Sequence, residues 1–329
     1  MKILLLRFSS IGDIVLTTPL LRCLHQQLPE VQVHYLTRTS YVSLLAPNPH
    51  IHKLWHFKKD IHEVMGELRK ENFDFIADLH CNWRSYRLRL ALQRPSSGFP
   101  KLNLKKWTLV NTKINLLPEI HVVDRYFKAV SRLGIVNDQQ GAEIFIPDTE
   151  KLNLDSLPAE FQQGFIAMAI GARHYTKQIP ESLAINLIRH LPLPVILLGG
   201  PEDQAKAEII VQQSQGRAFS ACGKFSLLQS ASALSLAKLV ITADTGLMHI
   251  AAALRKKIVV VWGNTVPEFG MGPYLPSPPL TVYHSEVKGL SCRPCSKLGH
   301  DRCPRGHFRC MMDQQPDLIL QKTLEMLKK

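Results

Sequence analysis

The sequence predicts an α/β protein built from two doubly wound parallel sheets. Three observations predict this class. Short apolar runs of strand length alternate with helical segments along most of the chain. Turns rich in Gly, Ser, Thr and Asp follow several of these runs. The chain has 329 residues, which is enough for two domains of ordinary size.

The first half of the chain has the pattern of one such sheet. Asp13 follows the first expected strand, at the start of a helix, where it is either a helix cap or a carboxylate aimed into a cleft as a general base. Gly12 either completes the turn or lets another group approach the backbone. The expected strands are Lys2–Phe8, Val31–Tyr35, Lys53–Phe57 and Phe73–Leu79, and the expected helices are Ile14–Leu28, one opening at Ser40–Leu45, Ile61–Glu71 and one over about 122–133.

A second series of strands and helices begins at Phe165. It follows a stretch from about Pro147 to Gln163 that contains two prolines and several polar residues, which we interpret as a linker between domains. The expected strands are Phe165–Ile170, Pro194–Leu198, Ser220–Cys222, Val240–Ala243 and Ile258–Trp262, and the expected helices are Glu181–His190, Gln204–Gln213, Leu227–Ser235 and Leu247–Leu254.

The turn formed by Asp244, Thr245 and Gly246 lies between a buried strand and a short apolar helix. A hydroxyl, a small residue and N–H groups at a helix N-terminus suit a phosphate. Asp244 either caps the helix or binds a ligand hydroxyl, and Thr245 is an equally ordinary cap. No G-x-x-x-x-G-K-[ST] motif occurs, and no G-x-G-x-x-G follows a strand, so an ordinary ATPase or a dinucleotide dehydrogenase is disfavoured.

The formal net charge of +13 predicts an anionic partner, which can be nucleic acid, a membrane surface or a phosphorylated substrate. No secretory signal and no run of about 20 apolar residues is present, so we expect a cytoplasmic protein. One basic stretch is not interrupted by Asp or Glu, and it is either a functional contact with such a partner or a chance cluster on a solvated surface. Its residues are Arg84, Arg87, Arg89, Arg94, Lys101, Lys105, Lys106 and Lys113.

Four of the 7 cysteines lie close together near the C-terminus. Cys292 and Cys295 have the C-x2-C spacing of a zinc ribbon, whereas Cys303 and Cys310 are more widely spaced than a usual knuckle. Four thiolates in a short segment can bind a tetrahedral zinc. Free packed thiols are the other interpretation, and disulfides are disfavoured in a reducing cytoplasm.

Several segments together resemble the ADP-heptose:lipopolysaccharide heptosyltransferases of glycosyltransferase family nine. They are FSSIGDIVLTTPLLRCL near the N-terminus, LLGGPED, TADTGLMHIAAAL, WGNTVPE and CRPCSKLGHDRCPRGHFRCM. The resemblance covers Lys2 to about Met311. It implies a GT-B fold, which has two Rossmann-like domains facing a central cleft. The expected domains are an N-terminal acceptor-binding domain over 1–155 and a C-terminal nucleotide-sugar-binding domain over 156–329, with the C-terminal helix packing back on the first domain.

The resemblance also implies an activity and its partners. The enzyme would be an inverting glycosyltransferase that needs no cofactor for catalysis and moves a heptose from ADP-heptose to the anionic inner core of lipopolysaccharide. It would be peripheral, at the cytoplasmic inner face of the inner membrane. A nucleic-acid-binding module is a poorer interpretation, because it leaves the polar turns after the strands without a role. Another nucleotide-sugar donor, or an inactive GT-B assembly partner, are the remaining alternatives.

The resemblance assigns roles to individual residues. Asp13 matches the general base, Lys177 matches a lysine that neutralises the leaving diphosphate, and His249 is expected to pack rather than to react. One departure is that Gln178–Ile179–Pro180 stands where many members have Arg-Trp-Pro or His-Trp-Pro. The expected donor-binding residues are Asp244, Thr245, Gly246, Gly199, Gly200 and Glu202, and the expected acceptor-binding residues are Gly12, Arg84 and Arg87.

Overall fold

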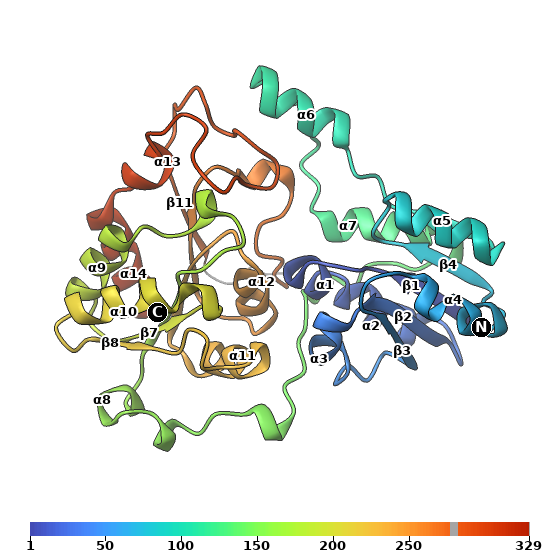
Figure 1. The fold of residues 1–329 in the computed structure, drawn as a ribbon, viewed down its shortest axis with the longest axis horizontal. Helices are drawn as coiled ribbons and strands as arrows, with labels where there is room; N and C mark the ends of the chain where they lie inside the picture. The colour runs from blue at the N-terminus through green and yellow to red at the C-terminus, as the bar shows by residue number, and fades with distance from the viewer. Residues whose placement is uncertain (277–281, 329) are drawn as a thin grey trace. The chain divides into compact units, whose positions relative to one another are not determined.

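The computed structural model describes residues 1–276 and 282–328. Its internal contacts divide the chain into two units (Figure 1). The N-terminal unit comprises Met1–Leu102 and Ile120–Phe145, and the C-terminal unit comprises Asn103–Glu119 and Ile146–Lys329. Residues 146–155 therefore pack with the second unit, and the predicted domain boundary after residue 155 stays a prediction.

The N-terminal unit contains, within the described residues, a five-stranded parallel sheet in the order β3-β2-β1-β4-β5. The four strands expected from the sequence are confirmed, and β5 was not predicted because it is short and polar. The strands are β1 (Lys2–Leu6), β2 (Gln32–Arg38), β3 (Lys53–Phe57), β4 (Phe75–Asp78) and β5 (Ser96–Gly98), and the helices are α1 (Ile11–Val15), α2 (Thr18–Gln27), α3 (Val42–Leu45), α4 (His62–Lys70), α5 (Trp83–Leu92) and α7 (Val122–Phe127).

The expected single helix over residues 14–28 is two helices, α1 and α2. Pro19 occupies the second position of α2, where its missing N–H costs nothing, but it cannot continue a helix from the preceding turn. The Thr17 hydroxyl donates a hydrogen bond to the Ile14 carbonyl at 2.7 Å, which satisfies an acceptor at the end of α1. The break allows α1 to be a short element that carries Asp13.

The C-terminal unit contains a six-stranded parallel sheet within the described residues, in the order β11-β10-β9-β6-β7-β8. Of these strands, β11 lies outside the expected set. The strands are β6 (Ile166–Ala169), β7 (Val195–Leu198), β8 (Ala218–Ser220), β9 (Leu239–Ala243), β10 (Ile258–Trp262) and β11 (Val282–Glu286), and the α-helices are α6 (Asn103–Thr112), α8 (Ala159–Gln162), α9 (Glu181–His190), α10 (Gln204–Gln213), α11 (Leu227–Leu236), α12 (Gly246–Ala253), α13 (Arg309–Met312) and α14 (Pro316–Lys328).

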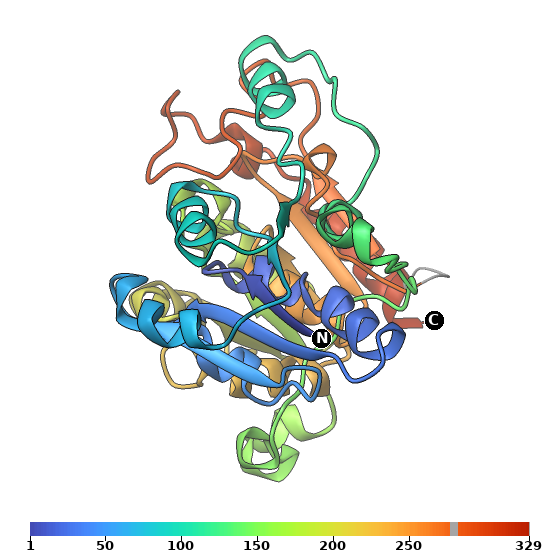
Figure 2. The ribbon, with the colours of Figure 1, turned by 90° about the vertical axis from the view of Figure 1, so that its right-hand side faces the viewer.

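The central strands of both sheets are buried on both faces, which is why they form continuous apolar runs in the sequence. Ile3–Leu6 of β1 and Ile258–Trp262 of β10 have no exposed surface. The final helix, α14, packs against α9 and β9 of its own unit. It is the dark red helix near the C label in Figure 2. Its predicted packing on the first domain stays a prediction. No helix among residues 1–276 and 282–328 has the length and apolar character needed to cross a bilayer.

The basic stretch from Arg84 to Lys113 is divided between the two units. Its first part forms α5 of the N-terminal unit, and its last part forms α6, which belongs by its contacts to the C-terminal unit. Leu109 of α6 is buried against Val266 and Phe269. The sequence alone did not separate these two helices.

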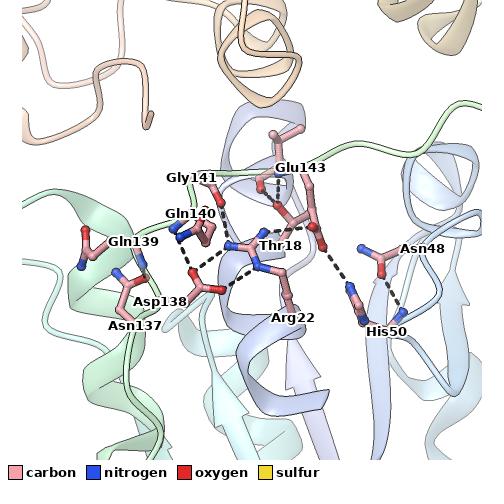
Figure 3. Close-up of polar contacts among 11 residues, drawn as sticks. Thr18, Arg22, Asn48, His50, Asn137, Asp138, Gln139, Gln140, Gly141 and Glu143 are labelled. Atoms are coloured by element: carbon pink, nitrogen blue, oxygen red, sulfur yellow. Dashed lines mark hydrogen bonds and ion pairs between the residues drawn. The ribbon is translucent and has the colours of Figure 1, made fainter. Parts of the chain in front are cut away.

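A buried arginine ties the last segment of the N-terminal unit to α2 (Figure 3). The Arg22 guanidinium forms two hydrogen bonds with Asp138, both at 2.8 Å, and another with Glu143 at 2.9 Å. It also donates to the Gly141 carbonyl at 2.9 Å. The other Glu143 oxygen lies 3.2 Å from His50 Nε2. Burial disfavours the charge of Arg22, but these carboxylates outweigh burial and raise the pKa of Arg22.

We expect Arg22→Ala to destabilise the protein by about 2–4 kcal/mol, because it leaves two carboxylates without their cation. Urea unfolding followed by circular dichroism measures this loss. Arg22→Lys should lose less, since it keeps the charge but not the planar fork. Arg132→Ala, at an exposed arginine, is the matched control. Equal unfolding midpoints for Arg22→Ala and Arg132→Ala would contradict this account.

Candidate functional site

The carboxylate of Asp13 lies just beyond the end of β1, where parallel sheets bind their ligands. Asp13 is the third residue of α1, and its Oδ2 accepts hydrogen bonds from the Ser10 backbone N–H at 3.2 Å and the Ser10 hydroxyl at 2.8 Å. It therefore does close the N-terminus of the helix. Its side chain remains 19% exposed, so this capping contact still leaves the carboxylate accessible to solvent.

Arg7 fixes Asp13 from the other side and was missed as a site residue by the sequence analysis. Its Nη2 lies 2.7 Å from Asp13 Oδ2, while Nε donates to the Ser9 carbonyl at 2.7 Å. Its Nη1 donates to the Leu79 carbonyl at 2.5 Å, so one guanidinium joins the chain after β1 to the chain after β4. Burial opposes the charge of Arg7, but Asp13 outweighs it and raises the pKa of Arg7. The charge of Arg7, interrupting an apolar run, was the available signal.

His80, which follows β4, is a second residue that the sequence analysis did not select. Its ring packs on Phe8 with the centroids 4.6 Å apart. Burial lowers the pKa of His80 to about 3, and the charges of Arg7, Lys101 and Arg38 act in the same direction, so the imidazole is neutral at pH 7. Positive charge from Arg7, Lys101 and Arg38 therefore acts on His80, which follows β4, the neighbour of β1, and positive charge there suits an anionic ligand.

The expected acceptor residues lie on two elements of this unit. Gly12 is buried inside α1, and its carbonyl accepts the Leu16 N–H at 3.0 Å. Arg84 and Arg87 are exposed on α5, where Arg87 Nη2 lies 3.4 Å from His62 Nε2. The first turn of α5 and Asp13 share one edge of the sheet, because β4 and β1 are parallel neighbours.

One hollow of the N-terminal unit, of about 680 Å³, lies elsewhere. Met1, Gln32 and Asp74 line it, so it lies at the amino-terminal ends of β1, β2 and β4. Ligands of parallel sheets bind at the opposite ends of the strands. We therefore assign the candidate site to the edge that carries Asp13.

In the C-terminal unit, Lys177 and Asp244 form an ion pair just beyond β9. Lys177 Nζ lies 2.6 Å from Asp244 Oδ2, and the Thr265 hydroxyl donates to the same oxygen at 2.7 Å. Burial alone would raise the pKa of Asp244, but the charge of Lys177 and the two hydrogen bonds lower it. Three segments far apart in the sequence therefore meet at one carboxylate.

Thr245, rather than Asp244, is the N-cap residue of α12. This removes the capping interpretation of Asp244, whose carboxylate is engaged by Lys177 and Thr265 instead. Gly246 is the first residue of α12, so its N–H is among those that a helix leaves without an internal partner. His249 is buried within α12, and its charge would act on Asp244. The helix N-terminus therefore has the form expected of a phosphate site.

The turn after β7 is built around Asp203. The Gly200 N–H donates to Asp203 Oδ2 at 2.9 Å, and burial raises the pKa of Asp203. A Cβ atom on Gly199 would lie 2.7 Å from that oxygen, and one on Gly200 would lie 2.3 Å from the exposed Glu202 carboxylate. Gly199 thus has a local steric reason, whereas the exposed Glu202 side chain can move away from a Cβ atom on Gly200. The expected contact of both glycines with a nucleotide stays a prediction.

Arg293 holds the loop that carries Thr265. Its Nε donates to the Gly263 carbonyl at 2.8 Å and its Nη2 to the Thr265 carbonyl at 3.0 Å, while Nη1 pairs with Glu286 at 2.8 Å. The neighbouring Asn264 is 1% exposed, and its side-chain amide has no hydrogen-bond partner among the described residues. Sequence analysis missed both residues, although Arg293 lies inside the C-x2-C motif.

The cysteine segment supports the turn that carries Lys177. The Thr176 N–H donates to the His300 carbonyl at 3.1 Å, and the His300 N–H donates to the Thr176 hydroxyl at 2.8 Å. A Cβ atom on Gly263 would lie 2.5 Å from the Thr176 carbonyl, so the 263–265 loop also touches this turn. The position of Lys177 therefore depends on the C-terminal segment.

The four clustered cysteines line one small cavity of about 20 Å³, together with His307 and Asn264. Burial raises the pKa of Cys295, and it raises that of Cys310 to about 12, with the neighbouring thiols contributing in both cases. No three His, Cys, Asp or Glu side chains are arranged to hold a metal in residues 1–276 and 282–328. The side chains as they stand do not form a metal site, and the structural zinc stays a prediction. The four are Cys292, Cys295, Cys303 and Cys310.

Comparison with protein-family models finds a match over residues 61–297 to glycosyltransferase family 9 (heptosyltransferase). The chain belongs to glycosyltransferase family 9. The enzyme is thus a glycosyltransferase. Its sequence is similar to lipooligosaccharide heptosyltransferase 2 of Haemophilus ducreyi, with 25% identity over 99% of each chain.

Solved structures agree with this family at the level of the fold. One is a glycosyltransferase family 9 protein from Veillonella parvula, with a TM-score of 0.78 and 22% identity, covering 99% of this chain and 97% of that one. Another is the ADP-heptose heptosyltransferase II of E. coli, with a TM-score of 0.73 and 21% identity, covering 100% and 99%. The two Rossmann-like units are those of the GT-B fold, as the sequence predicted.

A double-mutant cycle on Lys177→Met and Asp244→Asn tests the ion pair beyond β9. Lys177→Met leaves a nearly buried carboxylate without its cation, whereas the double variant removes both charges. We expect a coupling energy of about 1–3 kcal/mol in urea unfolding. The double variant should lose less unfolding free energy than the two single variants lose together. Strictly additive losses would show that the two side chains do not interact in solution.

Proposed function

We propose that this glycosyltransferase moves a heptose from ADP-heptose to the inner core of lipopolysaccharide, with inversion at the anomeric carbon. The name of one relative supports the sugar and the kind of acceptor, since the similarity to a lipooligosaccharide heptosyltransferase extends over 99% of both chains. The donor is suggested by the name of the similar E. coli structure, an ADP-heptose heptosyltransferase. The observation that carries the proposal is the Lys177–Asp244 pair beside the N-terminus of α12, a cation and a set of N–H groups suited to a diphosphate.

In the proposed reaction, the oxygen of the acceptor hydroxyl attacks the anomeric carbon of the heptose, and Asp13 accepts the proton of that hydroxyl. The bond between that carbon and the diphosphate oxygen breaks, and ADP leaves with the electron pair. Lys177 stabilises the charge that develops on the diphosphate. No cofactor takes part in these steps. The geometry that supports the role of Asp13 is its fixed position between Ser10 and Arg7.

The binding roles follow from the same elements. Asp244 would bind hydroxyls of the donor sugar, and the N–H groups of Thr245 and Gly246 its phosphates. The turn after β7 would shape the nucleotide pocket, through Gly199, Gly200 and Glu202. The cations around Asp13 support an acceptor that carries phosphates and acidic sugars, with Gly12, Arg84 and Arg87 at its edge. We also propose that the enzyme works at the cytoplasmic face of the inner membrane.

The alternatives keep the same fold. A different nucleotide-sugar donor would use the same diphosphate site, and an inactive assembly partner would need none of it. The retained Asp13, Lys177 and Asp244 favour an active enzyme. A structural zinc at the four clustered cysteines is proposed independently of catalysis, and elemental analysis of the purified protein tests it.

We expect Asp13→Asn to lower kcat for heptose transfer at least about a hundredfold, because it removes the proton acceptor while keeping the size of the side chain. Transfer from ADP-heptose to a core acceptor that lacks heptose, followed by chromatography, measures the rate. Ser10→Ala removes one hydrogen bond to the same carboxylate and should have a much smaller effect. Turnover of Asp13→Asn at the normal rate would exclude Asp13 as the base.

A further inference from the structure

Helix α5 of the N-terminal unit has two apolar stripes on opposite faces. Leu88 and Leu92 point inward and belong to the buried core of the unit. Trp83, Tyr86 and Leu90 recur at a spacing of three and four residues, which puts them on a single outward stripe. Their exposed fractions are 70%, 46% and 57%. The inward stripe packs the helix against the core of its unit, and the exposed outward stripe takes no part in that packing, so folding does not explain it.

Basic side chains accompany the outward stripe. Arg84 and Arg87 are exposed on the same helix, and Arg87 is the residue after Tyr86 in the sequence. In contrast, Arg89 is engaged by the fold, since its Nε donates to Ser96 at 2.9 Å and its Nη1 lies 3.7 Å from Asp78. The sequence contains no Asp or Glu from position 79 to position 118. The helix therefore presents apolar and cationic groups without acidic ones.

The aromatic members of the stripe have the chemistry of an interface between water and hydrocarbon. The Trp83 and Tyr86 rings stack with their centroids 5.7 Å apart. Trp and Tyr concentrate at the headgroup level of bilayers, because their rings are apolar and carry one polar group. Arginines beside such a stripe are attracted to anionic lipid headgroups. A bilayer surface with negative charge complements every group on this face.

We propose that α5 inserts the stripe formed by Trp83, Tyr86 and Leu90 into the interface of an anionic lipid bilayer, with Arg84 and Arg87 on the headgroups. The proposal rests on the proposed function, because the inner core of lipopolysaccharide is carried by a lipid. The helix begins at the edge of the sheet that also carries Asp13, since β4 and β1 are parallel neighbours. Anchoring α5 would thus bring the candidate base close to a membrane-borne acceptor.

Co-sedimentation of the full-length protein with lipid vesicles tests this proposal. One vesicle type is phosphatidylcholine alone and the other an equimolar mixture with phosphatidylglycerol. We expect binding to the anionic vesicles only, weakened at least about tenfold in the triple variant Trp83→Gln/Tyr86→Gln/Leu90→Gln. Gln keeps good helix propensity at these exposed positions. Unchanged binding by the triple variant would overturn the proposal.

A matched triple variant controls for the loss of exposed apolar surface. Val136→Gln/Ile209→Gln/Leu298→Gln also removes three exposed apolar side chains, which are 68%, 40% and 61% exposed, but none lies on α5. It should bind anionic vesicles as the unmodified protein does. An equal loss of binding by both triple variants would show that α5 has no special role.

Fluorescence quenching locates the contact. In a Trp107→Phe background, Trp83 is the exposed tryptophan, because Trp55 and Trp262 are 5% and 0% exposed. Brominated lipids in the anionic vesicles should quench its emission, as expected for insertion near the acyl boundary. A bound protein whose emission is not quenched would contradict insertion of this stripe.

Activity assays separate this proposal from the proposed function. The triple α5 variant should transfer heptose normally to a deacylated, water-soluble acceptor and poorly to an acceptor embedded in vesicles. A protein that binds vesicles through α5 but transfers no heptose would sink the proposed reaction alone. A protein that transfers heptose to both acceptors without needing α5 would sink the membrane proposal alone.

Discussion

The ion pair between Lys177 and Asp244 is the contact on which the candidate donor site depends. It joins a turn after β6 to the turn after β9, and Thr265 from the turn after β10 binds the same carboxylate oxygen. Two of these turns are held by further contacts. Arg293 donates to the carbonyl of Thr265, and Thr176, beside Lys177, is hydrogen-bonded to His300. The C-terminal cysteine segment therefore serves the site through hydrogen bonds, whether or not it binds a metal.

In the N-terminal unit, a cation likewise fixes a carboxylate, which here is that of the candidate base Asp13. The guanidinium of Arg7 stays protonated at neutral pH, so it is a permanent cation that holds the Asp13 carboxylate in place. The same guanidinium satisfies carbonyl groups after β1 and after β4, the two neighbouring strands at this edge. In both units, a largely buried cation thus organises a loop at the carboxyl ends of the central strands. A parallel sheet supplies such ends, and the loops there are free to carry function.

The sequence predicted the two sheets well because their central strands are buried on both faces and therefore appear as uninterrupted apolar runs. It did not predict β5, β11, α5 or α6, whose composition is polar or basic and whose structure depends on distant contacts. Asp13, Lys177 and Asp244 were selected from motifs, whereas Arg7, His80, Arg293 and Asn264 were missed. The importance of Arg7, His80 and Arg293 lies in partners up to 72 residues away, as for Arg7 and Leu79, which no local pattern encodes.

The most direct test of this account is thermal stabilisation of the purified protein by ADP, GDP, UDP and CDP. A ligand that binds only the native state raises stability by mass action. The account predicts selective stabilisation by ADP that is lost in Lys177→Ala and kept in Lys288→Ala, at an exposed lysine. Selective stabilisation by GDP or UDP would replace the donor. Absence of any shift would contradict a nucleotide-diphosphate site at Lys177 and favour an inactive assembly partner.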